Sequence, residues 1–586
     1  MSALNLNGAQ EQAVYHQGNL LITACPGSGK TAVLKERAIH KLRTDPKAKG
    51  IGVTFTKDAA KELQERVYLA FPEAATRFRV GTFHSLCIDQ LKKAGKSVHI
   101  AEEPLQNAYM YQAWQEVTGG VKSQLTFDFA RRYIESTKSQ VNPIIPDRNL
   151  NPAAAIYYRY QALLGQRDLK DFSDLVVFAT RGMMDGDIEP IDATFLLVDE
   201  FQDTDPVGLG WVEAHRRAGI EVTVVGDDDQ SVYGWRHAMG VEGMDQFRKQ
   251  SNATHISLNT TYRCPQEVIQ PAAKLILENS SRIPKQLRTE NRSKGTVRRL
   301  MAPTREAEIN ALIDAIEGTG KPGDWGVLAR SNKILDKAES LIGAKFEVSR
   351  NSGKGFWELR APALYLGLCR SVALDDLVGV DHVLRMSGVP EVRLTAIISQ
   401  FGSRNAGALT SFIASQDPKA HPAENYFKKV SRDWRKLCKA GLVENALSGM
   451  MEYLSHLDMA PPMAKNKEQL KERTIRHLDS SRRAMSAIRG DLLSRVRYAS
   501  QADDDTDDDE GGVPRVRLMT IHGSKGLEFP HVWMLACEDG VTPAKGSPLE
   551  EERRLFYVGM TRAKRTLTLS FSEGARSQFL DECGIL

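Results

Sequence analysis

One short segment constrains the fold of this chain more than any other: a glycine-rich loop between a strand-like run at 19–24 and a helical pattern at 32–42. The loop reads Ala24-Cys25-Pro26-Gly27-Ser28-Gly29-Lys30-Thr31. Glycines let backbone N–H groups surround phosphate oxygens, and the N-terminus of a helix favours their negative charge. We expect Lys30 to neutralise phosphate charge and the Thr31 hydroxyl to ligate Mg²⁺. A simple capping turn explains the segment less well, because Lys30 and Thr31 stand at the helix start.

A pair of carboxylates follows a second apolar run. Residues 195–198 read Phe-Leu-Leu-Val, and Asp199 and Glu200 come directly after them. In open α/β sheets, ligands bind beyond the carboxyl ends of the strands. We expect Asp199 to hold Mg²⁺, and Glu200 to orient and deprotonate the water that attacks a γ-phosphoryl group. An acidic pair after a strand is often only a helix cap, but the glycine-rich loop upstream favours ATP hydrolysis.

The alternation of strand-like and helical patterns predicts an α/β fold built on parallel sheets. Residues 95–165 and 371–500 interrupt this alternation with mainly helical patterns, so we expect two sheet-based lobes, each with a helical insertion. The acidic run at 503–510 predicts a solvated linker. The expected boundaries are 1–94 and 166–264 for the first lobe, 95–165 for its insertion, 265–370 and 511–586 for the second lobe, and 371–510 for its insertion with the linker.

Composition narrows the class of protein without choosing a function. The chain has 586 residues, of which 41% are hydrophobic and 26% charged, as in a globular protein of three to five domains. There is no apolar run long enough for a membrane span and no secretory pattern at the N-terminus. Seven widely spaced cysteines predict reduced thiols in the cytoplasm and no zinc or iron–sulfur site. The formal net charge of +4 neither requires nor excludes nucleic acid.

Further short segments follow one another in a characteristic order along the chain. They read LNGAQ at 6–10, VTFT at 53–56, GTFH at 81–84, DFSDL at 171–175, DEFQD at 199–203, VGDDDQSVYGWR at 225–236, LNTTYRCP at 258–265, TIHGSKGLEF at 520–529 and EEERRLFYVGMTRA at 550–563. This ordered set resembles the motifs of the UvrD/Rep/PcrA-like superfamily 1 DNA helicases. The resemblance covers both lobes nearly end to end, whereas the insertions match only in position and character. It implies two RecA-like parallel-sheet lobes with one ATP between them.

The resemblance also implies how the base and ribose of ATP are bound. Gln10 is expected to read adenine, Tyr262 to stack on it and Glu528 to contact the ribose. Members of this family often carry an arginine directly after the Lys-Thr pair of the loop, where this chain has Ala32. This difference predicts weaker discrimination between nucleotides.

Two arginines and a glutamine complete the catalytic set that the resemblance implies. Arg263 and Arg562 are expected to reach the γ-phosphate from the second lobe, where guanidinium groups stabilise the charge that spreads in the transition state. Gln230 is expected to sense the γ-phosphate and to couple it to DNA. An exposed salt bridge of little energetic value is the ordinary alternative for each arginine.

The same resemblance predicts a track for single-stranded DNA. Aromatic faces stack on bases at about 1–3 kcal/mol per base without reading sequence. Trp235 stands in a polar setting and is the best stacking candidate, whereas Phe83 and Phe172 could equally be core residues. The expected DNA contacts are Phe55, Thr56, Thr82, Phe83, His84, Phe172, Tyr233, Trp235, Arg330, Thr520 and His522.

A basic segment in the second insertion has two interpretations. Residues 465–497 hold ten lysines and arginines against four acids, in a spacing that indicates basic helices. These helices could bind duplex phosphates, which would make binding sensitive to salt. They could equally be solvated helix faces, and the sequence does not choose between the two.

Two departures from the family bear on unwinding and partners. The family usually carries a hairpin after its last motif that acts as a strand-separating pin, whereas residues 570–580 pass almost directly into the segment beyond it. The sequence ends at Leu586, so we expect no long tail of the kind through which relatives bind partners, and because no nuclease-like cluster follows the last motif, we expect no fused nuclease. We therefore expect translocation along DNA more than vigorous unwinding.

Three functions remain open at this point. The first is a Mg²⁺–ATP-driven motor on single-stranded DNA and at single-/double-strand junctions, moving 3′→5′ by family resemblance and with no membrane partner. The second is an ATP-switched DNA-binding subunit of a repair or defence complex that separates no strands itself. The third is an RNA motor, because discrimination at the 2′-hydroxyl cannot be recognised in the sequence.

Overall fold

The computed structural model of the chain describes residues 6–119, 125–343, 345–350, 357, 359–403, 405–457, 459, 467–501 and 514–585. Two compact units make up the chain: residues 1–312, 324–334 and 520–586 form the first, and residues 313–323 and 335–519 form the second. The acidic run at 503–510 lies outside the described residues. Among the helices of the described ranges, none has both the length and the apolar character that a bilayer crossing needs.

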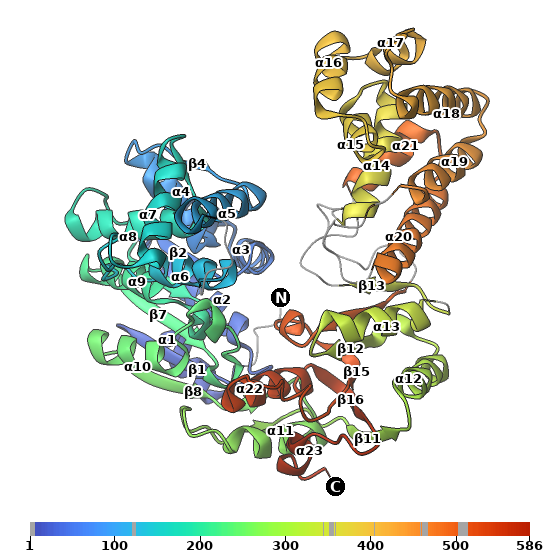
Figure 1. Ribbon diagram of the computed structural model, residues 1–586. Helices are drawn as coiled ribbons and strands as arrows, with labels where there is room; N and C mark the ends of the chain where they lie inside the picture. The colour runs from blue at the N-terminus through green and yellow to red at the C-terminus, as the bar shows by residue number, and fades with distance from the viewer. Residues whose placement is uncertain are drawn as a thin grey trace. The chain divides into compact units, whose positions relative to one another are not determined.

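A six-stranded parallel sheet organises the N-terminal part of the first unit (Figure 1). Its strand order is β3-β2-β6-β7-β1-β8. The strands are β1 (Leu20–Ala24), β2 (Gly50–Thr54), β3 (Phe78–Thr82), β6 (Phe195–Val198), β7 (Glu221–Gly226) and β8 (Thr254–Leu258). Because all these strands run in the same direction, their carboxyl ends meet at one edge. The glycine-rich loop follows β1 and the acidic pair follows β6, so both lie at that edge.

Alternate side chains of these strands point to opposite faces of the sheet, and each face has its own hydrophobic core. Leu20 and Ile22 of β1 belong to the core that includes α1, α2 and α3, whereas Leu21 belongs to the core that includes α4, α8, α9 and α10. The helices are α1 (Gly8–Tyr15), α2 (Lys30–Thr44), α3 (Lys57–Ala70), α4 (Phe83–Lys93), α8 (Phe172–Asp185), α9 (Pro206–Arg217) and α10 (Gly240–Ser251). Helices thus cover both faces, as doubly wound sheets require.

A small helical group interrupts the first sheet in sequence. It comprises β4 (His99–Ile100), α5 (Glu103–Thr118), α6 (Phe127–Lys138), α7 (Pro152–Gly165) and β5 (Leu169–Lys170). Its own core includes the buried side chains of Ile134, Ile156 and Tyr160. A buried ionic contact ties this group to α8, because the Lys138 Nζ lies 2.5 Å from the Asp171 Oδ2.

A second parallel arrangement fills the C-terminal part of the first unit. Its strands stand in the order β11-β16-β15-β12 and are β11 (Thr296–Ala302), β12 (Trp325–Ala329), β15 (Phe529–Leu535) and β16 (Ala563–Ser572). The accompanying elements are β9 (Thr260–Thr261), β10 (Arg288–Thr289), α11 (Gln266–Leu277), α22 (Leu549–Met560) and α23 (Gln578–Glu582). Residues 573–577 alone connect β16 to α23, so this described stretch contains no hairpin at the place of the expected pin.

The second unit is mainly helical. Its short strands β13 (Val348–Arg350) and β14 (Val516–Thr520) pair in parallel. Along the chain, the boundaries between the two units fall within α12 (Arg305–Thr319), between Gly323 and Asp324, within α13 (Asn332–Ile342) and before the last residue of β14. The remaining helices are α14 (Arg360–Leu374), α15 (Val378–Met386), α16 (Glu391–Phe401), α17 (Ala408–Ala414), α18 (Pro422–Lys439), α19 (Val443–Ser455), α20 (Lys467–Ala487) and α21 (Leu492–Gln501). They enclose a core that includes Tyr365, Phe412 and Phe427.

The predicted fold class is confirmed: the chain is an α/β protein with two RecA-like parallel-sheet lobes and mainly helical insertions. The residue boundaries assigned to the lobes and insertions remain predictions.

Candidate active site

The loop between β1 and α2 needs glycine at two positions. Gly27 and Gly29 have φ angles of 71° and 81°, in the left-handed region that other residues rarely adopt. A Cβ on Gly27 would lie 2.4 Å from the Arg263 Cβ, and one on Gly29 would lie 2.9 Å from the Gln10 Nε2. The Ser28 hydroxyl is buried and has no hydrogen-bond partner within the described part of the chain. A buried unpaired hydroxyl beside the free N–H groups of a helix start fits a phosphate group.

Lys30 and Glu200 form an ion pair at the edge of the first sheet. The Lys30 Nζ lies 2.9 Å from the Glu200 Oε1. Burial alone would raise the pKa of Glu200, but the positive charges of Lys30 and Lys525 outweigh it and hold this pKa well below its ordinary value. Burial, together with the charge of Glu200, raises the pKa of the neighbouring Asp199 to about 6. The two adjacent carboxylates therefore differ strongly in acidity, and Asp199 takes up a proton at a higher pH than Glu200.

Glu200 owes its orientation to the backbone and to Gln202. Its φ of 49° turns the chain sharply after β6. The Gln202 Nε2 donates to the Glu200 Oε2, and the Gln202 Oε1 accepts from the Asp227 N at 2.9 Å. Gln202 therefore links the ends of β6 and β7.

Residues from two distant parts of the sequence meet beside the loop: Asn7 and Gln10 near the N-terminus, and Tyr262. The Gln10 Nε2 donates to the Ser28 carbonyl at 2.9 Å. The Asn7 Nδ2 donates to the Tyr262 hydroxyl at 2.8 Å, and the Tyr262 N donates to the Gly27 carbonyl at 2.9 Å. An open cavity of about 1040 Å³ has Asn7 and Tyr262 in its lining. Because the Tyr262 ring is 44% exposed, it offers a free face for stacking.

Both predicted arginines lie in the same unit as Lys30. Arg263 lies against the glycine-rich loop, since a Cβ added to Gly27 would come within 2.4 Å of the Arg263 Cβ, and its Nε donates to the Glu528 Oε2 at 2.6 Å. Arg562 is 1% exposed, and its Nη2 donates to the Gln230 Oε1 at 2.8 Å. Burial, assisted by the charge of Arg263, lowers the pKa of Arg562 to about 9. The expected catalytic residues therefore converge on one region of the first unit.

An aromatic group stands beside this region. The rings of Phe55 and Tyr233 stack at 5.5 Å, and the Trp235 ring lies edge-on to Tyr233 at 6.3 Å. Trp235 is 60% exposed, and the guanidinium of Arg236 lies 4.5 Å from the centre of its ring. An exposed tryptophan between a ring and a guanidinium is suited to stack on bases.

The other aromatic candidates divide into an exposed and a packed residue. Phe172 is exposed and lies edge-on to His84 at 5.6 Å. Phe83 packs edge-on against the buried Trp211 at 5.5 Å, within the core beneath α4 and α9. Phe172 is therefore available to a ligand, whereas Phe83 mainly supports the helix on which it stands.

Two threonines of the predicted DNA track act as helix caps. The Thr56 side chain accepts from the Ala59 N at the start of α3, and the Thr82 side chain accepts from the Ser85 N at the start of α4. The capping fixes where each helix begins.

The remaining expected DNA contacts come from the second lobe. Arg330 forms an ion pair with Glu552 at 2.8 Å. The Thr520 Oγ1 accepts from the Gly523 N at 3.1 Å, and burial lowers the pKa of His522 to about 4. Arg330 and Thr520 thus have intramolecular partners, and the part of all three residues in DNA binding stays a prediction.

Sequence reasoning assigned no role to two lysines that the structure places among these residues. The Lys525 Nζ donates to the Asp203 Oδ2 at 2.5 Å and to the Gln230 carbonyl at 3.0 Å, and it lies 5.2 Å from the centre of the Tyr233 ring. Lys285 is buried among three aspartates. Lys525 could have been recognised from the sequence, because it lies inside the motif at 520–529. Lys285 could not, because it lies in a loop without any motif.

The basic segment of the second insertion makes ion pairs within its own unit. Arg473 contacts Asp336, and Arg495 contacts Glu444. Lys465 lies outside the described residues. These pairs account for part of the positive charge and favour neither interpretation of the rest.

The parallel sheets, the glycine-rich loop and the carboxylates at the edge of the first sheet define a P-loop protein. The model of the UvrD/REP helicase N-terminal domain matches residues 6–252, and that of the UvrD-like helicase C-terminal domain matches residues 410–574. Together the two matches span more than half of the chain. The chain therefore belongs to the UvrD/REP family of DNA helicases.

Relatives that align over most of their own length support this assignment. The ATP-dependent DNA helicase PcrA of Bacillus subtilis is 28% identical, over 96% of this chain and 82% of the relative. PcrA of Leuconostoc citreum is 27% identical, over 96% and 81%. DNA helicase II of Escherichia coli is 27% identical, over 98% and 85%.

Proposed function

We propose that the protein couples hydrolysis of Mg²⁺–ATP to 3′→5′ movement along single-stranded DNA in the cytoplasm, and that it opens duplex at single-/double-strand junctions. The hydrogen bond between Arg562 and Gln230 carries this proposal. It joins the end of β7, which follows the acidic pair, to the turn between α22 and β16. A group that binds there contacts both lobes, so its hydrolysis can change how they interact.

The residues of the glycine-rich loop suit the phosphates of ATP. Lys30 and the helix N-terminus bind the negative oxygens. Thr31 and Asp199 would hold Mg²⁺, which supplies charge neutralisation on the β- and γ-oxygens. Arg263 and Arg562 stabilise the charge that develops on the transferred phosphoryl group.

Glu200 acts as the base for the attacking water. Its ion pair with Lys30 lowers its pKa and so makes it a weak base. When phosphate oxygens share the Lys30 ammonium, this attraction weakens and the pKa of Glu200 rises. Binding of the substrate thus prepares the carboxylate to accept a proton from water.

Gln10 and Tyr262 would bind the base, with Glu528 near the ribose. Phe55, Tyr233 and Trp235 would stack on the bases of the DNA strand. Stacking requires no particular sequence, which suits movement along any strand.

The test is an ATPase assay with and without single-stranded DNA on Lys30→Ala and Glu200→Gln. Each variant should lose about 100-fold or more of the DNA-stimulated rate, because each removes a charged group at the reacting phosphate. Trp235→Ala should raise the DNA concentration needed for half-maximal stimulation about five- to hundredfold, whereas the exposed Phe129 of α6 provides a matched control as Phe129→Ala. Full activity of either active-site variant would refute the site assignment.

A second candidate function is an ATP-switched DNA-binding subunit without strand separation. The short connection 573–577, in the place of a pin hairpin, favours it. Strand displacement on 3′-tailed and 5′-tailed duplexes separates the two functions. ATP hydrolysis without displacement of either duplex supports the switch, displacement of the 3′-tailed duplex alone supports the motor, and stronger stimulation by RNA of the same sequence would indicate an RNA motor.

A further inference from the structure

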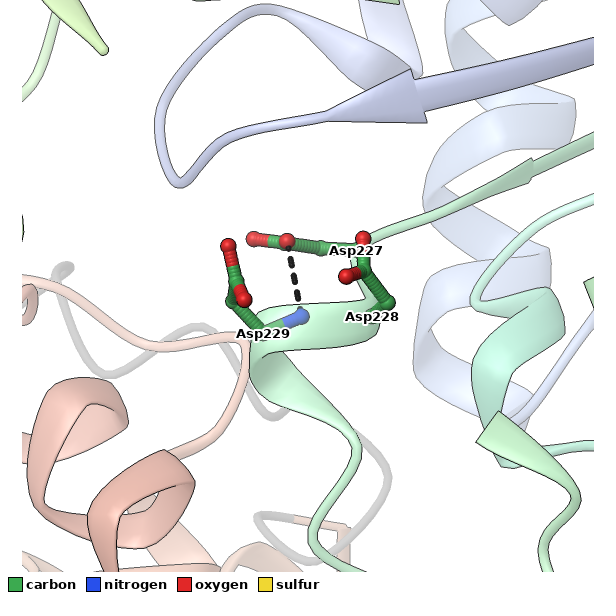
Figure 2. Close-up of side chains that lie close together, drawn as sticks. All are labelled: Asp227, Asp228 and Asp229. Carbon is green, nitrogen blue, oxygen red and sulfur yellow. Dashed lines mark hydrogen bonds between the residues drawn. The ribbon is translucent and has the colours of Figure 1, made fainter. Parts of the chain in front are cut away.

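Three consecutive buried carboxylates surround one ammonium group in the first unit. Figure 2 shows Asp227, Asp228 and Asp229 with their side chains gathered at the end of β7. The Lys285 Nζ lies 2.6 Å from the Asp227 Oδ1, 2.6 Å from the Asp228 Oδ1 and 3.0 Å from the Asp229 Oδ2. All four side chains are fully buried.

The three carboxylates have the spacing of a metal site, since one oxygen from each lies within 4.8 Å of the others. Lys285 contacts all three of them, at the place where a metal ion would have to lie. The cluster therefore holds an internal cation, supplied by the loop between α11 and β10.

Asp227 connects this cation to the candidate active site. Its Oδ1 accepts from Lys285, and its Oδ2 accepts from the Gln230 Nε2 at 2.6 Å. The Gln230 Oε1 then accepts from the Arg562 Nη2 at 2.8 Å. Rotation of the Gln230 amide by half a turn would point an N–H group at the donor of Arg562. Asp227 therefore determines which atom of Gln230 faces Arg562.

We propose that Lys285 is a positioning residue for ATP hydrolysis: it fixes Asp227, which holds the Gln230 amide so that its oxygen receives Arg562. The inference rests on the proposed function. In this role Lys285 touches neither the phosphates nor the water, and it acts only through Asp227 and Gln230.

The loop that carries Lys285 also holds the helix that leads to Arg562. The Asn279 Nδ2 donates to the Glu550 carbonyl at 2.9 Å, and the Ser280 N donates to the Glu550 Oε1 at 2.8 Å. Glu550 stands in the first turn of α22, and Arg562 follows the end of that helix. One loop thus fixes both partners of the bond between Gln230 and Arg562.

Arg282 offers a matched control within the same cluster. Its guanidinium forms two hydrogen bonds with Asp229, at 3.0 and 2.8 Å. It binds the carboxylate farthest along the run from Asp227, so Arg282→Met removes a positive charge from the cluster while the bonds that orient Gln230 remain.

The test compares kcat and KM for ATP, at saturating DNA, between Lys285→Met and the unaltered chain. Lys285→Met should lower kcat about ten- to hundredfold, as small misplacements of catalytic groups do, and leave KM within about threefold. Lys285→Arg should restore part of the rate, and Arg282→Met should keep kcat within about threefold. In a Gln230→Ala background, Lys285→Met should cause no further loss of kcat.

Several outcomes would overturn the proposal. If Lys285→Met lowers kcat by the same factor in the Gln230→Ala background as in the unaltered chain, Lys285 only stabilises the fold. The same conclusion follows if Arg282→Met lowers kcat as much as Lys285→Met does. If Lys285→Met does not fold, the double variant Lys285→Met/Asp228→Asn takes its place, because it keeps the net charge of the cluster. Its kcat is then compared with and without Gln230→Ala in the same way. An unaltered chain without DNA-stimulated ATPase activity would instead refute the proposed function.

Discussion

At the scale of single residues, the hydrogen bonds of the buried His215 require one protonation state of its ring. His215 on α9 is fully buried, and its Nδ1 lies 2.8 Å from the Trp211 carbonyl while its Nε2 lies 3.2 Å from the Ile191 N. A neutral ring with its proton on Nδ1 satisfies both neighbours, whereas a protonated ring would point an N–H group at the Ile191 N–H. Burial lowers the pKa of His215 to about 4.

This environment makes the stability of the first unit depend on pH. The pKa of His215 is lower in the folded chain than in the unfolded one, so the unfolded state binds more protons between pH 6.5 and 4. Stability should therefore fall as the pH decreases through this window, by up to about 3 kcal/mol from this residue, and its contribution should be constant above pH 7. Thermal unfolding midpoints at several pH values, compared between the unaltered chain and His215→Gln, measure the effect.

The difference between the two chains should narrow as the pH falls towards 4. The exposed His382 in the second unit gives the control, because His382→Gln should change the free energy of unfolding by less than about 0.5 kcal/mol. A difference between His215→Gln and the unaltered chain that stays constant from pH 7 to 4 would show that His215 does not titrate as its surroundings require.

The sequence points to those candidate active-site residues whose proposed role depends on local structure. The glycine-rich loop and the pair Asp199–Glu200 are each recognisable because a strand and the residues after it are contiguous in the chain. Lys285 could not be predicted in this way, because the aspartates that it contacts lie in a distant segment of the sequence. A single lysine in a loop without a motif has the same local appearance whether it is solvated or buried among three carboxylates.

At the scale of elements, α2 depends on one buried arginine. Arg37 is fully buried; its Nη1 donates to the carbonyls of Ala13 and His16 at 2.8 Å, and its Nη2 pairs with Glu221 at 2.8 Å. These bonds join α1, α2 and β7, and α2 begins at Lys30. The helical pattern of 32–42 was predicted from the sequence, but Arg37 is an ordinary helix residue in that pattern, so its burial was not.

Replacement of Arg37 by methionine should destabilise the first unit. The side chain is of similar length, but the change leaves the carbonyls of Ala13 and His16 without this donor, while Glu221 keeps its ion pair with Lys41. The loss of these buried hydrogen bonds costs about 2–4 kcal/mol. Arg43→Met, at the exposed end of the same helix, should change the free energy of unfolding by less than about 1 kcal/mol. Denaturant unfolding followed by circular dichroism measures both changes. Equal free energies of unfolding for the two variants would show that the buried contacts of Arg37 do not stabilise the packing of α2.

At the scale of the whole molecule, the two units differ in their relation to the candidate active site. Every residue expected to bind ATP lies within 1–312 or 520–586, which belong to the first unit. The core of the second unit is formed by its own helices, among them α14, α18 and α19. Binding of a nucleotide should therefore stabilise the first unit directly, while the second unit has no expected nucleotide contact.

Hydrogen exchange with and without a non-hydrolysable ATP analogue tests this division. At a ligand concentration one hundred times the Kd, binding contributes about 2.7 kcal/mol to the stability of the unit that holds the site. Exchange should slow at residues 24–31 and 199–203, and change little in α14, α18 and α19. Lys30→Ala, which removes the phosphate-binding ammonium, should abolish the protection at the same analogue concentration. Protection of α18 and α19 as strong as that of the loop would contradict a site confined to the first unit, because ligand contacts slow exchange most where binding adds stability.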